Sequence, residues 1–424
     1  MKILLLNQTF YPDNLATSQQ IADLAVFLKE KGHEVSVVSG QRAYEERSKK
    51  FPKRETWNGV NIFRVSSTGL GKKRFRYRIL DSLTFFISLA GKLLFFPKQD
   101  LVISFTSPPL MGFWGTLFCW MKGGRSVQWL MDVNPDAAFE VGYLKRRSIL
   151  GAILNAVFEF TLTSAQNVVV LDRWMKKRML EHGAQEEKIT IVPPWSVLVG
   201  GSVVITEESQ AFKKQHGLSG KFVVLYSGNH SVVHPLTTLL EAALVLREDP
   251  QIAFLFIGAG LRTQDVYHFK VRHKLANIVQ LPLQPREKMG ASFGAADLHA
   301  VVMGSKMSGL VHTSKIYSVL ASGKPFVFVG PKNSHAGDTV NECQSGFVVE
   351  HEQVSELVSA IKRTQALSVQ EKQEIGNRNI QYVLNRFQPQ KTLQRFYDSV
   401  VCPVTAGATK SLAVSGDPIS DTPT

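Results

Sequence analysis

The chain has 424 residues, long enough for two or three ordinary domains, and its 44% hydrophobic residues supply a substantial core. Fibrous and disordered proteins are therefore excluded. Lys and Arg number 49 against 35 Asp and Glu, so the formal net charge of +14 favours acidic partners such as phosphates, anionic lipid or nucleic acid. The three cysteines, Cys119, Cys343 and Cys402, lack the paired spacing of a disulfide framework or a zinc site, which fits a reducing compartment.

The N-terminal segment indicates a strand, a helix and a second strand. Residues 2–8, KILLLNQ, form an apolar run too short for a signal peptide, and we expect a buried first strand. The next apolar residues recur at helical spacing, which predicts one buried helix face made of Ile21, Leu24, Ala25 and Leu28. Gly32 ends this helix, and residues 33–40 form the next strand.

Two long apolar stretches follow, at residues 83–96 and 110–121. Both are shorter than the roughly 18 to 20 residues that cross a bilayer, so we expect no membrane span. The basic segment GKKRFRYR, residues 71–78, directly precedes the first stretch. Two interpretations remain open: a seat for an anionic membrane face, or a solvated loop followed by a core helix.

A second series of strands begins at residues 221–228, KFVVLYSG. A helix follows, with Leu236, Leu239, Leu240 and Ala243 on its inward face. Further strand-sized apolar runs are closed by Gly, Pro or Asp, and they lie at residues 252–260, 277–285, 296–302 and 324–331. Alternating strands and helices predict an α/β protein made of two doubly wound, Rossmann-like domains that face each other across a cleft.

The predicted boundaries follow from breaks in this alternation. The first domain covers residues 1–195, and a linker covers 196–215, where no period is sustained. The second domain covers residues 216–387, and a helix at 388–402 finishes the fold. Residues 403–424 are rich in Ser, Thr, Gly, Ala and Pro, which predicts a disordered tail.

Two loops at strand ends are candidate ligand sites, because open α/β sheets bind ligands there. In the loop from Tyr226 to His234, Gly228 permits close backbone approach before a helix whose N-terminus favours anions. A turn without a ligand explains this pattern equally well. In the segment from Val311 to Pro331, Thr313 or Ser314 is expected to cap a short helix whose first turn contains Lys315. A cation there indicates either a bound anion or a solvent-facing side chain.

Together these segments resemble the retaining nucleotide-sugar glycosyltransferases of family 4, which have the two-domain GT-B fold. The resemblance covers residues 1 to about 400 and rests on YPDNLATSQQIADLAVFLKEKGHEVSVVSG, VVVLDRWMKKRMLEHGAQEEKITIVPPW, YSGNHSVVHPLTTLLEAA, AFLFIGAG and SKIYSVLASGKP in this order. Bacterial enzymes that assemble surface polysaccharide on a lipid carrier are the most similar members. The resemblance implies that the first domain binds the acceptor, that the second binds the donor, and that the last helix returns to the first domain.

By this resemblance, the donor diphosphate meets Gly228, Lys306, Ser314 and Lys315. Many members place an Arg and a Lys in the second-domain loop, where this sequence has Asn229 and His234. Many also carry a pair of Glu residues, and the matching positions here are Leu310 and Ser318, of which Ser318 would meet the nucleotide ribose. We expect Lys315 and His234 to stabilise the leaving diphosphate, since a lysine serves as a point charge.

On the acceptor side, Asp132 and Asp136 follow a strand-like VQWLM, and they either contact acceptor hydroxyls or form a turn with Asn134 and Pro135. Asp132 is the expected catalytic residue of this domain, and Thr17 of the first loop is a further acceptor contact. No set of His, Cys, Asp and Glu has metal-ligand spacing, so neither a metal nor a further cofactor is expected beside the nucleotide sugar.

The resemblance predicts transfer of a hexosyl or N-acetylhexosaminyl group to a hydroxyl of a lipid-linked saccharide, at the inner face of the cytoplasmic membrane. Two alternatives remain: an enzyme like the nucleotide-sugar 2-epimerases, or a catalytically inactive protein that binds sugar nucleotide or lipid, favoured by Leu310 and Ser318. Nucleic acid is not an expected partner, because no nucleic-acid-binding motif occurs.

Overall fold

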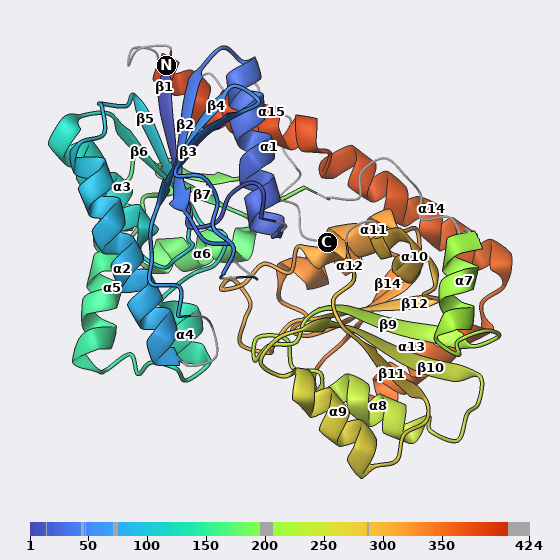
Figure 1. Ribbon diagram of the computed structural model, residues 1–424. Coiled ribbons are helices and arrows are strands. Elements are labelled where there is room, and N and C mark those ends of the chain that lie inside the picture. Colours follow the sequence, from blue (N-terminus) through green and yellow to red (C-terminus); the bar gives the residue numbers. More distant parts are fainter. Residues whose placement is uncertain are drawn as a thin grey trace.

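The computed structural model describes residues 1–405 apart from residues 14, 44–45, 47, 71–74, 196–206 and 286–287. Two separate sheets organise the chain, each flanked by helices (Figure 1). The α/β class, the two Rossmann-like sheets and the GT-B arrangement predicted from the sequence are confirmed.

The first sheet has eight strands in the order β3-β4-β2-β1-β5-β6-β7-β8. All neighbours pair in parallel except β3 and β4. The strands are β1 (Lys2–Leu6), β2 (Glu34–Gly40), β3 (Arg54–Trp57), β4 (Val60–Val65), β5 (Leu101–Ser104), β6 (Arg125–Trp129), β7 (Asn167–Val170) and β8 (Ile189–Ile191). The central strands are buried on both faces, which explains why β1 and β5 are uninterrupted apolar runs.

Helices cover both faces of this sheet. They are α1 (Ala16–Glu30), α2 (Phe75–Leu94), α3 (Met111–Lys122), α4 (Asp136–Glu140), α5 (Ile149–Ser164) and α6 (Arg173–Glu181), and a 3-10 turn spans Glu186–Lys188. Helices α2 and α3 pack on the face that carries Leu4 and Leu6, whereas α1 packs on the face of Ile3 and Leu5. The predicted face of α1, from Ile21 to Leu28, is fully buried at its four apolar positions.

The second sheet is parallel throughout, with the order β11-β10-β9-β12-β13-β14. Its strands are β9 (Phe222–Asn229), β10 (Ile252–Ala259), β11 (Ile278–Leu281), β12 (Leu298–Val302), β13 (Phe326–Val329) and β14 (Gly346–Val349). Its helices are α7 (Glu207–Gln215), α8 (Thr237–Val245), α9 (Thr263–Arg272), α10 (Met289–Gly294), α11 (Lys315–Ala321), α12 (His335–Cys343), α13 (Val354–Ala366) and α14 (Val369–Arg386).

The segment predicted as a linker lies partly outside the described residues, at 196–206. The remainder, residues 207–215, was expected to lack structure and instead forms α7. Phe212 of this helix is buried with Leu218, Val223 and Leu225 of the second domain. The second domain therefore includes α7, because one apolar side chain is enough to anchor a short polar helix to the sheet.

The C-terminal segment crosses back to the first domain. Helix α15 (Pro389–Phe396) continues into a π-helical turn, Tyr397–Val401, and into α16 (Cys402–Thr405). Phe396 is fully buried and stacks on Trp129 of β6 with 4.5 Å between ring centroids. A hydrogen bond of 3.1 Å joins the Tyr397 hydroxyl to His33 Nε2. Figure 1 shows α14 and α15 running as one path from the second domain to the first. Residues 406–424 of the predicted tail lie outside the described residues.

Candidate active site

The two domains meet through the segment that follows β12. The backbone N–H of Val133 donates to the Leu310 carbonyl at 2.8 Å, and Asp132 and Val311 form an isolated antiparallel bridge. Leu310 is buried within the core of the first domain, although it belongs to the second. Leu310, one of the two positions that the resemblance matches to a Glu pair, joins the two domains by apolar packing.

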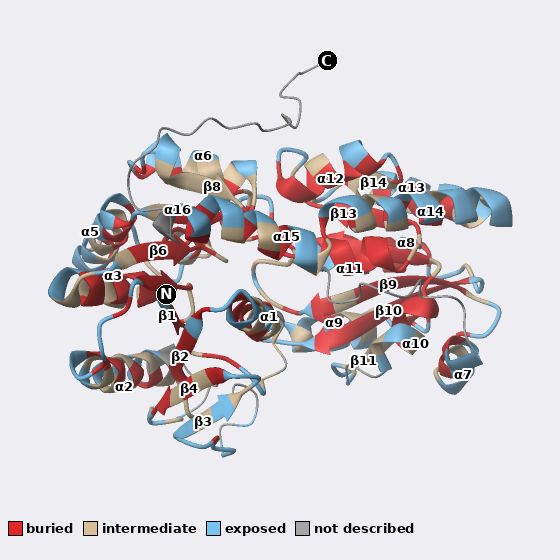
Figure 2. Ribbon diagram, turned by 90° about the horizontal axis from the view of Figure 1, so that it is seen from above, coloured by how far each residue is buried: buried red, intermediate tan, exposed pale blue. Residues whose placement is uncertain are grey.

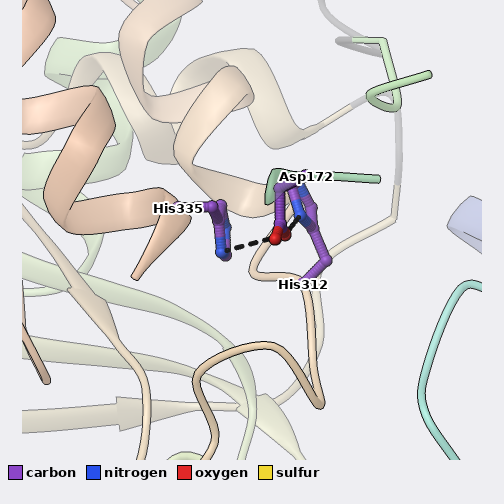
Figure 3. A group of neighbouring side chains, drawn as sticks. All are labelled: Asp172, His312 and His335. Atoms are coloured by element: carbon purple, nitrogen blue, oxygen red, sulfur yellow. Dashed lines mark hydrogen bonds and ion pairs between the residues drawn. The ribbon is translucent and has the colours of Figure 1, made fainter. Parts of the chain in front are cut away.

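A buried group of Asp172, His312 and His335 forms a second interdomain link (Figure 3). Asp172 caps α6 in the first domain by accepting from the Met175 N–H at 2.8 Å. Its other oxygen lies 2.7 Å from His312 Nδ1, so His312 donates to Asp172 and turns Nε2 toward the Tyr317 hydroxyl, 2.9 Å away. Burial by itself would raise the pKa of Asp172, but the hydrogen bond and charge of His312 outweigh it and hold that pKa at about 2.

This group has the residue types of a metal site but not the geometry. The Thr313 N–H donates to His335 Nε2 at 3.0 Å, which places the imidazole proton on Nδ1, the nitrogen that faces Asp172. The two imidazole rings stack with centroids 3.7 Å apart and planes 19° apart, so a cation cannot lie in both ring planes at bonding distance. The group therefore serves as a hydrogen-bonded link between the domains.

A third link lies at the edge of the same interface. Arg173 donates through Nε and Nη2 to the two oxygens of Asp338, each at 2.7 Å, and the Trp174 indole donates to Asp338 at 2.8 Å. This forked contact joins α6 of the first domain to α12 of the second. The loops at the carboxyl ends of β6, β7 and β12 thus hold the domains together where open sheets bind their ligands.

Lys315 and Gly228, both expected at the donor site, lie together in the second domain. Lys315 is the first residue of α11, and its Nζ lies so close to Gly228 that a β-carbon on that glycine would be 2.1 Å from it. Lys315 is an exposed residue, but its ammonium group lies among protein atoms, where desolvation lowers its pKa to about 8. A side chain at position 228 would displace the lysine ammonium.

Two histidines flank this lysine. Burial, and secondarily the charge of Lys315, lowers the pKa of His234 to about 3 and that of His230 to about 4. His234, expected to help stabilise the diphosphate, has a neutral imidazole at physiological pH. Its Nδ1 lies 3.0 Å from Ser231 Oγ, and it remains a hydrogen-bonding group rather than a charge.

His230 belongs to the same loop after β9. It is fully buried, and neither ring nitrogen has a hydrogen-bond partner in the described structure. Its backbone N–H donates to the Ala259 carbonyl, and its own carbonyl lies 2.2 Å from where Gly260 would carry a β-carbon. The loop after β9 is thus pressed against the loop after β10, and the glycine pair in AFLFIGAG was the signal for this close approach.

An open hollow of about 450 Å³ lies beside this contact, at the carboxyl ends of β10 and β11. Gly258, Thr263, Tyr267, Gln280 and Leu281 are among its lining residues. Gly258 pairs in register with Gly228, so the hollow lies one strand away from the glycine that Lys315 approaches. The hollow was not predicted from the sequence, because its lining residues come from four separate elements and loops.

On the first-domain side, Asp132 is half-buried beside the interdomain segment. Burial raises the pKa of Asp132 to about 6, and the nearby His312 limits the rise. A carboxyl with this pKa carries a proton in part of the molecules near neutral pH. Asp132 is therefore the first-domain residue that has both the location and the protonation equilibrium expected of a catalytic or acceptor-contacting group.

The carboxylate of Asp136, expected on the acceptor side, is paired with cations and a histidine inside the first domain. It is fully buried at the start of α4, where Arg146 donates to one oxygen at 2.8 Å and Arg178 and His182 contact the other at 2.6 and 2.8 Å. Burial alone would raise the pKa of Asp136, but the His182 hydrogen bond and the surrounding cations lower it to about 2. Its carboxylate stabilises the fold.

The other predicted residues lie around the site with mixed outcomes. The side chain of Ser314 precedes α11 without capping it, and the buried Thr313 hydroxyl has no partner among the described residues, so neither makes the predicted cap. Ser318 is buried in α11, which leaves little surface for a ribose. Two predicted donor-site residues are exposed: Asn229, the last residue of β9, and Lys306, which follows β12. Thr17 is half-buried in the first turn of α1.

Comparisons with known proteins agree with this architecture. Residues 16–195 match the glycosyl transferase 4-like domain family. The chain is 26% identical over 388 residues to WcaI of Escherichia coli strain K12, whose name places it in glycosyl transfer for colanic acid biosynthesis, covering 86% of this chain and 92% of WcaI. It is 25% identical over 298 residues to WbjE of Pseudomonas aeruginosa, named as a glycosyltransferase, covering 70% of each chain.

Among solved structures, HepE of Anabaena in complex with UDP-glucose matches with a TM-score of 0.68. The match covers 95% of this chain and 100% of HepE at 15% sequence identity, so it shows the fold. The sequence and structure comparisons together extend over both domains of the chain.

Proposed function

Because the chain carries a glycosyl transferase 4-like domain and is distantly homologous to bacterial surface-polysaccharide glycosyltransferases, we propose that it transfers a sugar from a nucleotide diphosphate sugar to a hydroxyl of a lipid-linked saccharide. The transferred group is a hexose or N-acetylhexosamine, and the anomeric configuration is retained. One observation carries the proposal. Lys315 Nζ lies directly over Gly228, and Lys315 follows by four residues Val311, which bridges to Asp132 of the first domain.

The donor diphosphate binds at Lys315. The lysine supplies a charge-assisted contact, and the missing side chain of Gly228 lets the ligand approach the backbone after β9. His234 contributes a neutral imidazole, which serves as a hydrogen-bonding group at this position. Lys306, Asn229 and Ser314 border this position, and Ser318, being buried, stabilises α11 from within.

The nucleoside occupies the adjoining hollow. Its volume of about 450 Å³ falls within the range of ligand pockets, and its mouth carries the exposed ring of Tyr267. A base can stack on this ring while the diphosphate reaches Lys315 past Gly258. The complex of HepE with UDP-glucose, a protein of the same fold, agrees with a nucleotide sugar as donor.

The chemistry requires stabilisation of the leaving group. Breaking the bond between the anomeric carbon and the diphosphate places negative charge on the diphosphate and positive charge on the sugar. Lys315 faces the first of these charges, so it stabilises the transition state more than the ground state. In the retaining course, the acceptor hydroxyl approaches from the side the diphosphate leaves, and the departing phosphate oxygen accepts the hydroxyl proton.

Asp132 acts from the first domain. Its ionised carboxylate accepts a hydrogen bond from an acceptor hydroxyl and orients it toward the anomeric carbon. Because Val311 of the interdomain bridge contacts Asp132 and lies four residues before Lys315, the two groups are positioned by one short segment. Closure of the domains around this segment excludes water, which would otherwise hydrolyse the donor.

The decisive experiment is a panel of UDP-, GDP- and dTDP-sugars incubated with the purified chain and bacterial membrane extract. The proposal predicts release of free nucleotide from one donor, dependent on extract, together with label transfer to lipid. Change of the donor sugar without acceptor would indicate a 2-epimerase instead. Donor binding without release in any mixture would indicate the inactive binding protein that Leu310 and Ser318 favour.

The site of action follows from the acceptor. A lipid-linked saccharide remains at the membrane, so we place the chain peripherally on the inner face of the cytoplasmic membrane, in the biosynthesis of cell-envelope polysaccharide. Among the helices that the structure describes, none has both the length and the apolar character to cross a bilayer. The basic cluster at residues 71–78 lies largely outside the described residues.

A further inference from the structure

The side of the first domain that faces away from the second domain exposes an unusual amount of apolar surface. Figure 2 shows α5, α3 and α2 beside one another along this side, and Figure 1 shows the same layer. Ring contacts connect the three helices: Phe86 of α2 lies 6.1 Å from Trp114 of α3, and Phe113 of α3 lies 6.4 Å from Phe160 of α5. We call this layer the outer helix face.

Helix α2 turns an apolar stripe to solvent. Exposed residues at helical spacing are Ile79, Leu83, Ile87 and Leu94, and Phe95 extends the stripe with 85% of its surface exposed. The charged residues of this stretch turn inward. Asp81 is buried and accepts from the Thr68 hydroxyl at 2.6 Å, and Lys92 Nζ lies 4.5 Å from the Phe63 ring centroid. The helix thus carries apolar residues on both faces.

Helices α3 and α5 repeat this arrangement. In α3 the exposed stripe includes Trp120, 82% exposed, and Met121. In α5 it includes Ile149, 83% exposed, Ile153 and Phe160. Lys122, at the end of α3, donates to the Leu94 and Phe96 carbonyls, and the half-exposed Glu159 of α5 accepts from Asn155 and contacts His182. Three neighbouring helices therefore expose a continuous apolar surface.

Cations border this surface at both ends. Lys145 and Arg147 are exposed just before α5, and Lys98 is exposed just after α2. An apolar surface of this extent marks an interaction site in a soluble domain, and flanking Lys and Arg favour an anionic partner. Exposed Trp and Phe are typical of side chains that lie at the boundary between lipid headgroups and acyl chains.

We propose that the outer helix face docks onto an anionic lipid bilayer, with α2, α3 and α5 lying along the headgroup boundary. A second copy of the chain fits less well, because a two-fold pair through this face brings its cationic borders against each other. A bilayer accepts the apolar stripes and attracts the same cations. The inference rests on the proposed lipid-linked acceptor for its purpose, and on the surface itself for its location.

Vesicle flotation of the purified full chain tests the proposal. Vesicles of phosphatidylethanolamine with phosphatidylglycerol are compared with vesicles of phosphatidylcholine alone. The test variant combines Ile87→Glu with Trp120→Glu, and the matched control combines Val271→Glu with Val369→Glu, two exposed apolar positions of the second domain. We expect wild type and control to float with the anionic vesicles, and the test variant to bind at least about tenfold more weakly at an unchanged Tm.

Equal flotation of the test variant and wild type would overturn the proposal, as would failure of wild type to bind the anionic vesicles. A wild-type dimer that the test variant dissolves, without vesicle binding, would assign the face to a second copy. If the Glu pair lowers Tm, the milder pair Ile87→Ser and Trp120→Ser is used with the same criteria. Nucleotide release is measured separately, so loss of the proposed transferase activity with intact flotation would refute the function and leave the docking face standing.

Discussion

Replacement of Lys315 by methionine tests the donor site most directly. Methionine keeps a long unbranched side chain and removes the charge, so Gly228 still faces a comparable volume. His230 and His234 are neutral at physiological pH, so neither adds a positive charge beside Lys315. One lost charge-assisted contact costs about 1.5 to 3 kcal/mol, so kcat/KM for the donor should fall by about 10- to 100-fold.

The pH dependence supplies a second signature of Lys315. Burial of its ammonium group lowers the pKa of Lys315 to about 8, and the protonated form is the one that binds a diphosphate. Wild-type donor affinity should therefore be constant at low pH and weaken as the pH rises through about 8. Lys315→Met should show weak affinity at all pH values, without this dependence.

Calorimetric titration with UDP and other nucleoside diphosphates, and initial rates with the active donor, measure both effects. Lys391→Ala, which removes an exposed cation on α15, serves as the matched control and should leave donor affinity unchanged. Tm should be the same in all three proteins, because Lys315 lies outside the hydrophobic core. Wild-type affinity and turnover in Lys315→Met at equal Tm would show that the donor lies elsewhere.

Four further outcomes are expected. Asp132→Asn should lower kcat at least tenfold with little change in donor KM. Wild-type kcat should fall as the pH drops below about 6, where the Asp132 carboxyl becomes protonated, and an unchanged pH profile would remove Asp132 from the site. Asp136→Asn should destabilise the fold by about 3 kcal/mol in chemical unfolding at neutral pH, since it removes the buried charge that Arg146, Arg178 and His182 share. Because the folded pKa of Asp136 is depressed to about 2, the wild-type contribution should persist above pH ~4 and disappear toward pH ~2. Asp338→Ala removes the forked contact with Arg173 that joins α6 to α12 across the domain interface. X-ray scattering should then report a larger radius of gyration without a change in Tm, and an unchanged radius would show that the other interdomain links suffice. EDTA should leave turnover unchanged. Among the described residues, the group of Asp172, His312 and His335 has stacked imidazole rings and a His335 nitrogen that already accepts from the Thr313 N–H, so it lacks the geometry of a metal site. Loss of activity that Mn²⁺ restores would contradict this.

The fold was predictable because its signals are local. Apolar runs such as KILLL and the helical spacing of Ile21 to Leu28 depend on residues a few positions apart, and two such series imply two sheets. The approach of Lys315 to Gly228 was also accessible, since both residues stand at the ends of recognisable strands. Patterns of this kind determine the edge of the sheet at which a residue lies.

What escaped prediction depends on contacts between distant segments. In the sequence, Asp136 resembles a carboxylate in an exposed loop. Its partners are Arg178 of α6 and His182, which directly follows α6, and no residue near position 136 predicts these contacts. The link between Asp172 and His312 joins residues 140 positions apart. Burial also determines charge, because desolvation lowers the pKa of His234 to about 3 and keeps its imidazole neutral, which the sequence alone does not predict.

The return of α15 to the first domain has a consequence for synthesis of the chain. Phe396 fills the space beside Trp129, so the core of the first domain is complete only when residues near 400 are present. A ribosome releases those residues only after the whole second domain has emerged. The core of the first domain therefore cannot be completed until then, and its apolar surface stays available to chaperones while the second domain is translated. A gene fragment that stops at the domain boundary would encode a first domain with an open core.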